Sequence, residues 1–173
     1  SNVETFAALQ LHIDTWRWAG VPFYIRAGKS LPISCTEVIV DFKLPPLSLF
    51  DEVEAPESNY FRFRLSPDVV ISAGVRVKQA GTEMRGEAVE LTLRHQPAQE
   101  DLPYARLLGD AIKGDAALFT SGGNVEAAWA VVDPALHMSE QLQVYEAGSW
   151  GPSAAADIVH GEEGWHNPIP GKT

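Results

Sequence analysis

Short segments in which apolar and polar residues alternate fill the first two-thirds of the chain. In residues 60–65, for example, large apolar side chains alternate with Arg62 and Arg64, which is the period of a strand with one buried face. Parallel strands need a long crossover connection, usually a helix, and no segment of helical period separates these strands. We therefore expect a mainly antiparallel sheet of about six strands. The expected strands are Phe6–Trp18, Val21–Arg26, Glu37–Lys43, Tyr60–Leu65, Val69–Val77 and Ala88–Leu93.

The apolar period becomes helical after these strands. Asp101 is a plausible N-cap for a first helix that has Pro103 in its first turn. A second helix is expected after Asn124, and Pro134 should kink or end it. Strands followed by two or more helices packed on one face indicate an α+β fold. Residues 148–173, rich in Gly and Pro, read as an extended tail anchored by Trp150.

Charge and composition exclude several classes of protein. The 173 residues are 45% hydrophobic and 21% charged, which is typical of a globular domain. The net charge of −10 argues against a nucleic-acid partner. No apolar run approaches the roughly 18 residues of a membrane span, and the first residues do not resemble a signal peptide. We expect no membrane partner and a cytoplasmic protein, and the single Cys35, a weak candidate nucleophile, is compatible with that compartment.

The segment Trp16–Lys29 carries the best candidate site. The large apolar residues of this segment indicate a buried strand. The two cations and the glycine at its end indicate that this strand places positive charge at a pocket. Lys29 is the first candidate, although most lysines after strands are simply solvated. Arg26 is the second, either as a direct ligand or as the partner of a carboxylate such as Asp14 or Glu37.

Other candidates have plainer explanations. His12 and Asp14 lie two residues apart and would share a strand face, so they form either a base with its orienting group or, more commonly, a structural pair. His160 and His166 lack metal-ligand spacing. The tryptophans at 16, 18, 129 and 150 are expected in core or interface packing.

Several segments, in order, resemble the C-terminal domain of glucose-6-phosphate dehydrogenases. They are Leu11–Trp18, Val21–Lys29, Asn59–Leu65, Tyr104–Leu108 with Asp110–Ile112, Ala127–Trp129 with Val132–Pro134, and Ala147–Pro152. The resemblance covers nearly the whole chain. It identifies residues 1–147 as the later part of the family's α+β domain.

The resemblance implies a function for the whole enzyme. Family members oxidise glucose 6-phosphate to 6-phosphogluconolactone with NADP, the first step of the oxidative pentose phosphate pathway. They are homo-oligomers, dimers or tetramers. The Lys of the family's Arg-x-Gly-Lys segment, which touches the substrate, corresponds to Lys29, and Arg26 is the next candidate for substrate binding. Many members carry a second cation five residues later, where this chain has Ser34.

The resemblance does not extend to the family's signature segment Arg-Ile-Asp-His-Tyr-Leu-Gly-Lys-Glu or to its catalytic His, both of which are missing from the sequence. A Gly-x-Gly-x-x-Gly after a strand, the coenzyme fingerprint, does not occur either. We therefore expect no Rossmann domain and no catalytic residue in this chain, NADP bound mainly by an N-terminal domain, and an inactive isolated fragment. The alternative is a stand-alone, non-catalytic dimerisation or regulatory module derived from the enzyme.

Overall fold

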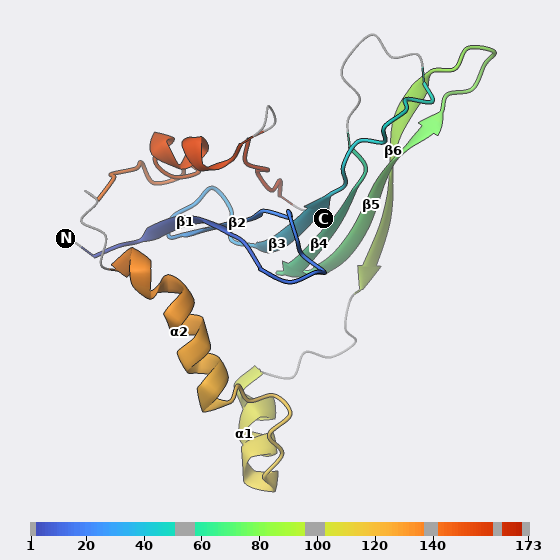
Figure 1. Cartoon of the computed structure of the whole chain (residues 1–173). Helices are drawn as coiled ribbons and strands as arrows, with labels where there is room; N and C mark the ends of the chain where they lie inside the picture. The colour runs from blue at the N-terminus through green and yellow to red at the C-terminus, as the bar shows by residue number, and fades with distance from the viewer. Residues whose placement is uncertain (1–2, 51–57, 96–102, 137–141, 161–163, 171–173) are drawn as a thin grey trace. The chain divides into compact units, whose positions relative to one another are not determined.

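A computed structural model describes residues 3–50, 58–95, 103–136, 142–160 and 164–170 (Figure 1). The chain divides into one unit of residues 1–96 with 143–173 and a second unit of residues 97–142. The described elements, in chain order, are β1 Phe6–Leu11, β2 Phe23–Gly28, β3 Thr36–Asp41, β4 Tyr60–Ser66, β5 Val69–Lys78, β6 Gly86–His95, α1 Pro103–Lys113, α2 Gly122–Leu136 and the 3₁₀ helix η1 Ser153–Ile158.

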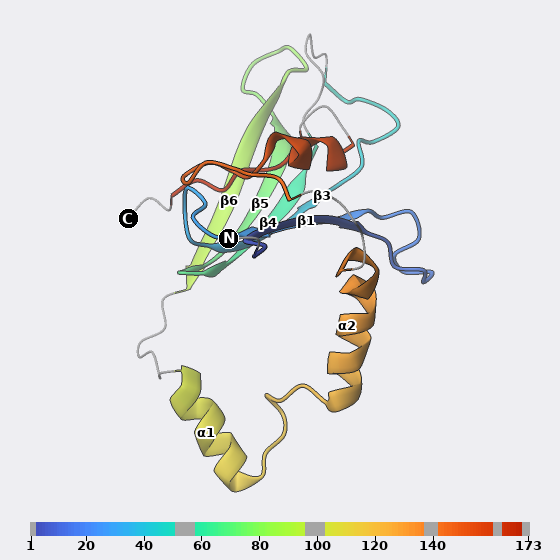
Figure 2. The ribbon, with the colours of Figure 1, turned by 90° about the vertical axis from the view of Figure 1, so that its left-hand side faces the viewer.

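All strand pairs in the first unit are antiparallel, as the sequence predicted. β1 and β2 form a two-stranded sheet in which Phe6 lies opposite Gly28 and Leu11 opposite Phe23. The other four described strands form a second sheet in the order β3-β4-β5-β6, so each strand pairs with its neighbour in sequence (Figure 2). Antiparallel neighbours can be joined directly, so this order needs no crossover connection. The fold is therefore of the α+β class, with its strands divided between two sheets.

The two faces of the four-stranded sheet differ in polarity. Phe63 lies opposite Val38 of β3 and Ile71 of β5, so apolar side chains of neighbouring strands share one face. Leu91 and Leu93 of β6 continue this face and keep 65% and 67% of their surface exposed. We call this surface the apolar face; it comprises Val38, Val40, Phe61, Phe63, Leu65, Ile71, Ala73, Val75, Val89, Leu91 and Leu93.

The opposite face carries the buried interactions. The Nε of Arg64 donates to a carboxylate oxygen of Glu37 at 2.7 Å, and only 9% and 2% of these two side chains are exposed. A second oxygen of Glu37 lies 2.9 Å from Nε2 of His166. Charged groups are rarely buried unless they are paired, and here each has its partner in the adjacent strand or in the C-terminal residues.

A second polar cluster on the same face is centred on Glu90. Arg62 and Tyr60 each contact one of its carboxylate oxygens, and the Thr92 hydroxyl donates to it at 3.1 Å. Burial works to raise the pKa of Glu90, but the hydrogen bonds from Tyr60 and Thr92 and the positive charge of Arg62 outweigh it, so this pKa lies below its ordinary value. The carboxylate is therefore held ionised.

The helical unit begins with α1 at Pro103, as expected, but its second helix begins earlier than predicted. Ser121 is the N-terminal cap of α2, because its hydroxyl oxygen accepts from the N–H of Asn124 at 3.3 Å. Asn124 itself lies inside the helix, and α2 continues to Leu136, two residues past Pro134. The expected cap Asp101 lies outside the described residues.

The strand predicted from Phe6 to Trp18 ends at Leu11. Pairing with β2 begins at the Leu11–Phe23 pair, so the intervening residues form the connection, with a turn closed by the bond from the Trp18 N–H to the Thr15 carbonyl at 3.1 Å. Trp16 is fully exposed in this connection, so of the two expected roles, core or interface packing, the core role is wrong. Among the described helices, none is both long enough and apolar enough to cross a membrane.

The first prediction concerns Arg64. Arg64→Met keeps an apolar stem but leaves Glu37 buried without its cation, and the free energy of unfolding should fall by about 3–5 kcal/mol. Arg85→Met is the control, because the Arg85–Glu83 pair is largely exposed and should contribute less than about 1 kcal/mol. Urea denaturation measures both variants, and equal losses would contradict the role of burial.

The second prediction concerns pH. A carboxylate with a lowered pKa stabilises the fold above its ordinary pKa of about 4.5, and this stabilisation is lost as the pH falls through the folded value. Glu90→Gln should therefore be less stable than the parent at pH 7, and the difference should shrink as the pH falls below 4.5. Glu87→Gln, an exposed change in the same strand, should show no such pH dependence in urea denaturation.

Candidate functional site

Lys29 lies immediately after β2, and its backbone is tightly fixed. Its N–H donates to the Thr5 carbonyl at 2.8 Å, and its carbonyl accepts from the Tyr145 hydroxyl at 2.7 Å. Ser30, the next residue, has a φ of 51°, in the left-handed region that a non-glycine residue seldom adopts. The Lys29 side chain is exposed and makes no hydrogen bond or ion pair with any residue that the structure describes. The arrangement therefore presents an ammonium from a fixed backbone.

The Phe6 ring packs closely against the backbone of this strand end. It packs against Tyr145, with ring centroids 5.4 Å apart. A Cβ atom at Gly28 would lie 2.8 Å from the ring, and one at Gly151 would lie 2.3 Å from it. Both positions therefore need glycine because the ring approaches their backbones so closely. The residue just before Lys29 is thus in contact with the core of the small sheet.

Arg26 lies on β2, three residues before Lys29, between two tryptophans. Its guanidinium carbon lies 4.8 Å from the centre of the Trp150 ring and 5.0 Å from that of Trp165. Its Nη2 donates to the His166 carbonyl at 3.0 Å and to Oδ1 of Asn167 at 2.8 Å. Burial lowers the pKa of Arg26. Arg26 pairs with neither of the carboxylates considered from the sequence, and Glu37 binds Arg64 and His166 instead.

Residues 164–170, which we call the tail segment, contact both sheets. Arg26 of the small sheet binds its backbone at His166, and Arg64 of the large sheet donates to its Ile169 carbonyl at 2.8 Å. The Trp165 indole donates to the Ala155 carbonyl of η1 at 2.6 Å. η1 in turn packs against β1 (Figures 1 and 2). The tail therefore has several anchors, whereas the sequence predicted Trp150 alone.

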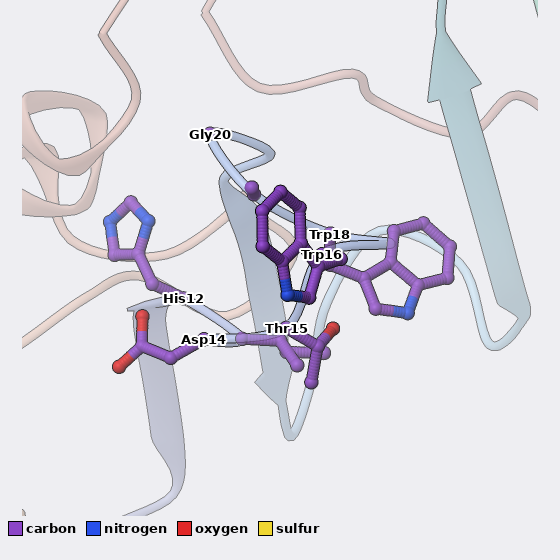
Figure 3. A pocket seen from close by; sticks show the side chains of 8 residues that line it. His12, Asp14, Thr15, Trp16, Trp18 and Gly20 are labelled. Carbon is purple, nitrogen blue, oxygen red and sulfur yellow. The ribbon is translucent and has the colours of Figure 1, made fainter.

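Two pockets are formed by residues of the first unit. One, of about 280 Å³, is lined by residues around Arg26, Trp150 and Trp165. The other, of about 460 Å³, is formed by the β1–β2 connection, with His12 and Asp14 on one side of the view and the indoles of Trp16 and Trp18 on the other (Figure 3). Lys29 lines neither of them.

The remaining candidates do not form a reactive cluster. His12 contacts Gln10 at 3.2 Å, and no interaction recorded among the described residues joins it to Asp14. Burial raises the pKa of the Cys35 thiol, and the nearby Glu37 carboxylate adds to this rise while Arg64 opposes it, so Cys35 is a poor nucleophile. The described residues contain no group of His, Cys, Asp and Glu suited to a metal ion.

Sequence reasoning missed Tyr145, Trp165 and Asn167. Each contacts a residue more than 100 positions away in the chain, so no local pattern could pair them. The available signal was weaker: single aromatic residues within segments rich in Gly and Pro, where a large side chain needs a specific partner to be ordered.

The third prediction concerns Arg26. Arg26→Lys keeps the charge but loses the planar group that stacks on both indoles and donates twice. Chymotryptic cleavage after Trp165 should accelerate at least about tenfold, as measured by mass spectrometry. Arg17→Lys, an exposed arginine 6.0 Å from the Trp18 ring, should leave this cleavage rate unchanged. An unaltered cleavage rate in Arg26→Lys would show that other contacts hold the tail segment.

Comparisons with known proteins identify the family. The model of the glucose-6-phosphate dehydrogenase C-terminal domain matches residues 1–166. The glucose-6-phosphate 1-dehydrogenase of Treponema pallidum is 40% identical over 97% of this chain and 35% of its own length. That of Mycolicibacterium smegmatis is 39% identical over 96% of this chain and 35% of its own length. The chain thus spans about a third of the length of these curated relatives.

Solved structures agree with this result. A crystal structure of glucose-6-phosphate 1-dehydrogenase from Mycobacterium avium superposes with a TM-score of 0.84 and 37% identity, over 99% of this chain and 37% of the solved chain. A structure of glucose-6-phosphate dehydrogenase in complex with its substrate glucose-6-phosphate gives a TM-score of 0.76 and 26% identity, over 89% and 33%. The antiparallel sheets, the Arg-x-Gly-Lys strand end and the match across residues 1–166 lead to one conclusion: this chain belongs to the glucose-6-phosphate dehydrogenase family and corresponds to its C-terminal domain.

Proposed function

We propose that this chain is the later part of the C-terminal domain of an NADP-dependent glucose-6-phosphate dehydrogenase, and that it supplies one wall of the sugar-phosphate pocket and part of a subunit interface. The observation that carries the proposal is the match to the family's C-terminal domain across residues 1–166. A relative named for a complex with glucose 6-phosphate supports the choice of substrate. Residues 1–147 would form the domain part and residues 148–173 its tail.

Lys29 is the proposed substrate contact. A sugar phosphate carries two negative charges near neutral pH, and an ammonium is a compact cation that can bind its oxygens. The exposed Lys29 side chain has no partner among the described residues, so its charge is available to a ligand. Its backbone, bound on both sides by Thr5 and Tyr145, limits where that charge can lie. Positioned charge is what distinguishes a binding lysine from a solvated one.

Arg26 has a different part in the proposed site. Its donors are directed to the Trp150 and His166 carbonyls and to Asn167, and indole rings lie against its guanidinium. A guanidinium that is already bound in this way has few donors left for a substrate. We therefore propose that Arg26 shapes the pocket by holding the tail segment, and that any contact with the substrate is secondary to that of Lys29.

The coenzyme does not fit the described residues. All six described strands are antiparallel, and none leads through a glycine-rich turn into a helix, which is how a dinucleotide pyrophosphate is usually held. NADP would therefore be bound by an N-terminal domain, and the catalytic base would come from a part of the full-length enzyme outside this chain. No step of hydride transfer is assigned to this chain, and the isolated chain should be inactive.

The apolar face supports the proposed interface. A soluble monomer seldom exposes a continuous apolar patch across four strands, and such patches commonly mark sites of association. Val38, Phe61, Leu91 and Leu93 are each more than 40% exposed on this face. We propose that a second copy or another part of the full-length enzyme covers it, in a cytoplasmic homo-oligomer, either a dimer or a tetramer.

The alternative function is a stand-alone dimerisation or regulatory module. The same apolar face favours it, because that surface would serve association without catalysis. The coding sequence upstream of Ser1 separates the two proposals. A Rossmann domain in the same reading frame supports the dehydrogenase, and a native start at this point supports the module.

The fourth prediction tests Lys29 in the full-length enzyme. Lys29→Ala removes a charge-assisted contact worth about 1–3 kcal/mol, so the KM for glucose 6-phosphate should rise between about 5- and 150-fold. The KM for NADP should stay the same, because the coenzyme lies on another domain. Lys43→Ala, another exposed lysine beyond a strand end, is the control. Steady-state NADPH formation gives both KM values for each variant, and an unchanged KM for glucose 6-phosphate in Lys29→Ala would refute the role of Lys29.

A further inference from the structure

We propose that Tyr145 is a positioning residue for substrate binding, and that its hydroxyl sets the backbone from which Lys29 reaches the sugar phosphate. The inference rests on the proposed function of Lys29 and extends it to a residue 116 positions away in the chain. Tyr145 is not required to touch the substrate in this proposal. It acts through the peptide group that joins Lys29 to Ser30.

The Tyr145 hydroxyl lies at the meeting point of three segments. It donates to the Lys29 carbonyl at 2.7 Å, and the carbonyl and hydroxyl oxygens of Thr5 lie 3.2 and 3.3 Å from it. A hydroxyl has a single proton, and the shortest of these contacts is the one to Lys29. Because the Thr5 carbonyl also accepts from the Lys29 N–H at 2.8 Å, both backbone polar groups of Lys29 are satisfied.

The backbone conformation of Ser30, the residue after Lys29, makes the hydrogen bond from Tyr145 to the Lys29 carbonyl more important. Ser30 has a left-handed φ of 51°, which costs conformational energy for a residue with a side chain and persists only where the surroundings hold it. The Ser30 carbonyl accepts from the Gly148 N–H at 2.7 Å. Residues 145–148 therefore bind two successive carbonyls, one on each side of the strained residue. This arrangement fixes the orientation of the two peptide groups that flank Ser30, including the one that joins it to Lys29.

The aromatic ring of Tyr145 has a separate role from its hydroxyl. The ring packs against Phe6, which contacts the Gly28 backbone. The ring therefore contributes packing, whereas the hydroxyl orients the Lys29 peptide group. A lysine side chain is long and flexible, so the position of its ammonium is determined first by its backbone. Removal of the hydroxyl alone should preserve the packing and loosen the placement of the charge.

The fifth prediction is the corresponding experiment in the full-length enzyme. Tyr145→Phe should raise the KM for glucose 6-phosphate about two- to tenfold, the change expected from one lost hydrogen bond, while the KM for NADP and the melting temperature stay near the parent values. Tyr24→Phe is the matched control: Tyr24 is also half-buried in the same unit, and its hydroxyl has no partner among the described residues. It should leave the KM for glucose 6-phosphate unchanged.

A double-mutant cycle decides whether Tyr145 acts through Lys29. In the Lys29→Ala background, Tyr145→Phe should have no further effect on the KM for glucose 6-phosphate. An equal effect in both backgrounds would overturn the proposal. So would equal rises in both KM values with a lower melting temperature, because Tyr145 would then be purely structural.

The cycle also separates the two proposals. If Lys29→Ala raises the KM for glucose 6-phosphate and Tyr145→Phe does not, the positioning role fails and the function of Lys29 stands. If Lys29→Ala has no effect, the substrate contact itself is wrong, and the role of Tyr145 fails with it.

Discussion

Two arginines on different sheets bind the backbone of the same short tail segment, and the described arrangement of the first unit depends on these contacts. Arg26 donates to the His166 carbonyl and Arg64 to the Ile169 carbonyl. An irregular segment has no ladder of its own, so its carbonyls need donors from elsewhere. Cationic donors make the stronger class of hydrogen bond, and here they connect the small sheet to the large one. The tail segment is thus held mainly by polar contacts at defined points.

These buried charged contacts also account for the unusual polarity of the large sheet, in which the polar face is the buried one. An antiparallel sheet usually buries its apolar face and exposes its polar one. Here, within the described residues, the polar face contains the nearly buried Arg64 and Glu37, whereas the apolar face is open. Ala155 is the single buried apolar residue in the described part of the chain. Such a distribution is expected of a domain part that is completed by further protein, in agreement with the coverage of about a third of its relatives.

The sequence predicted the strands well because period-two alternation depends on local chemistry. The run 60–65 became β4 almost residue for residue, since its apolar residues and its arginines do lie on opposite faces. The connection 12–22 was misread, because its first residues keep the alternation while pairing with β2 has already stopped at Leu11. Register is a property of two strands, and one strand alone does not reveal where it ends.

The candidate site was predicted only in part, because a local pattern identifies a strand end but not its distant partners. The strand end at Lys29 was identified from its composition and from the family resemblance, and its role as substrate contact remains a prediction. The partners of Arg26 were not foreseen, because an arginine near two carboxylates in sequence favours an ion pair, whereas the folded chain brings tryptophans from the C-terminal region to it. Contacts between residues so far apart in the sequence arise from tertiary structure, and no pattern within a short window of residues predicts them.

The ring of Phe6 occupies a narrow space between the backbones at Gly28 and Gly151. A side chain added at either glycine would have to displace the ring, and the displaced ring would press on the other backbone. These three positions are therefore coupled sterically, although they come from β1, from β2 and from the residues just before η1. We expect positions 28 and 6 to co-vary among homologous sequences, with a larger residue at 28 accompanied by a smaller one at 6, whereas position 151, with a φ of 108°, should remain glycine.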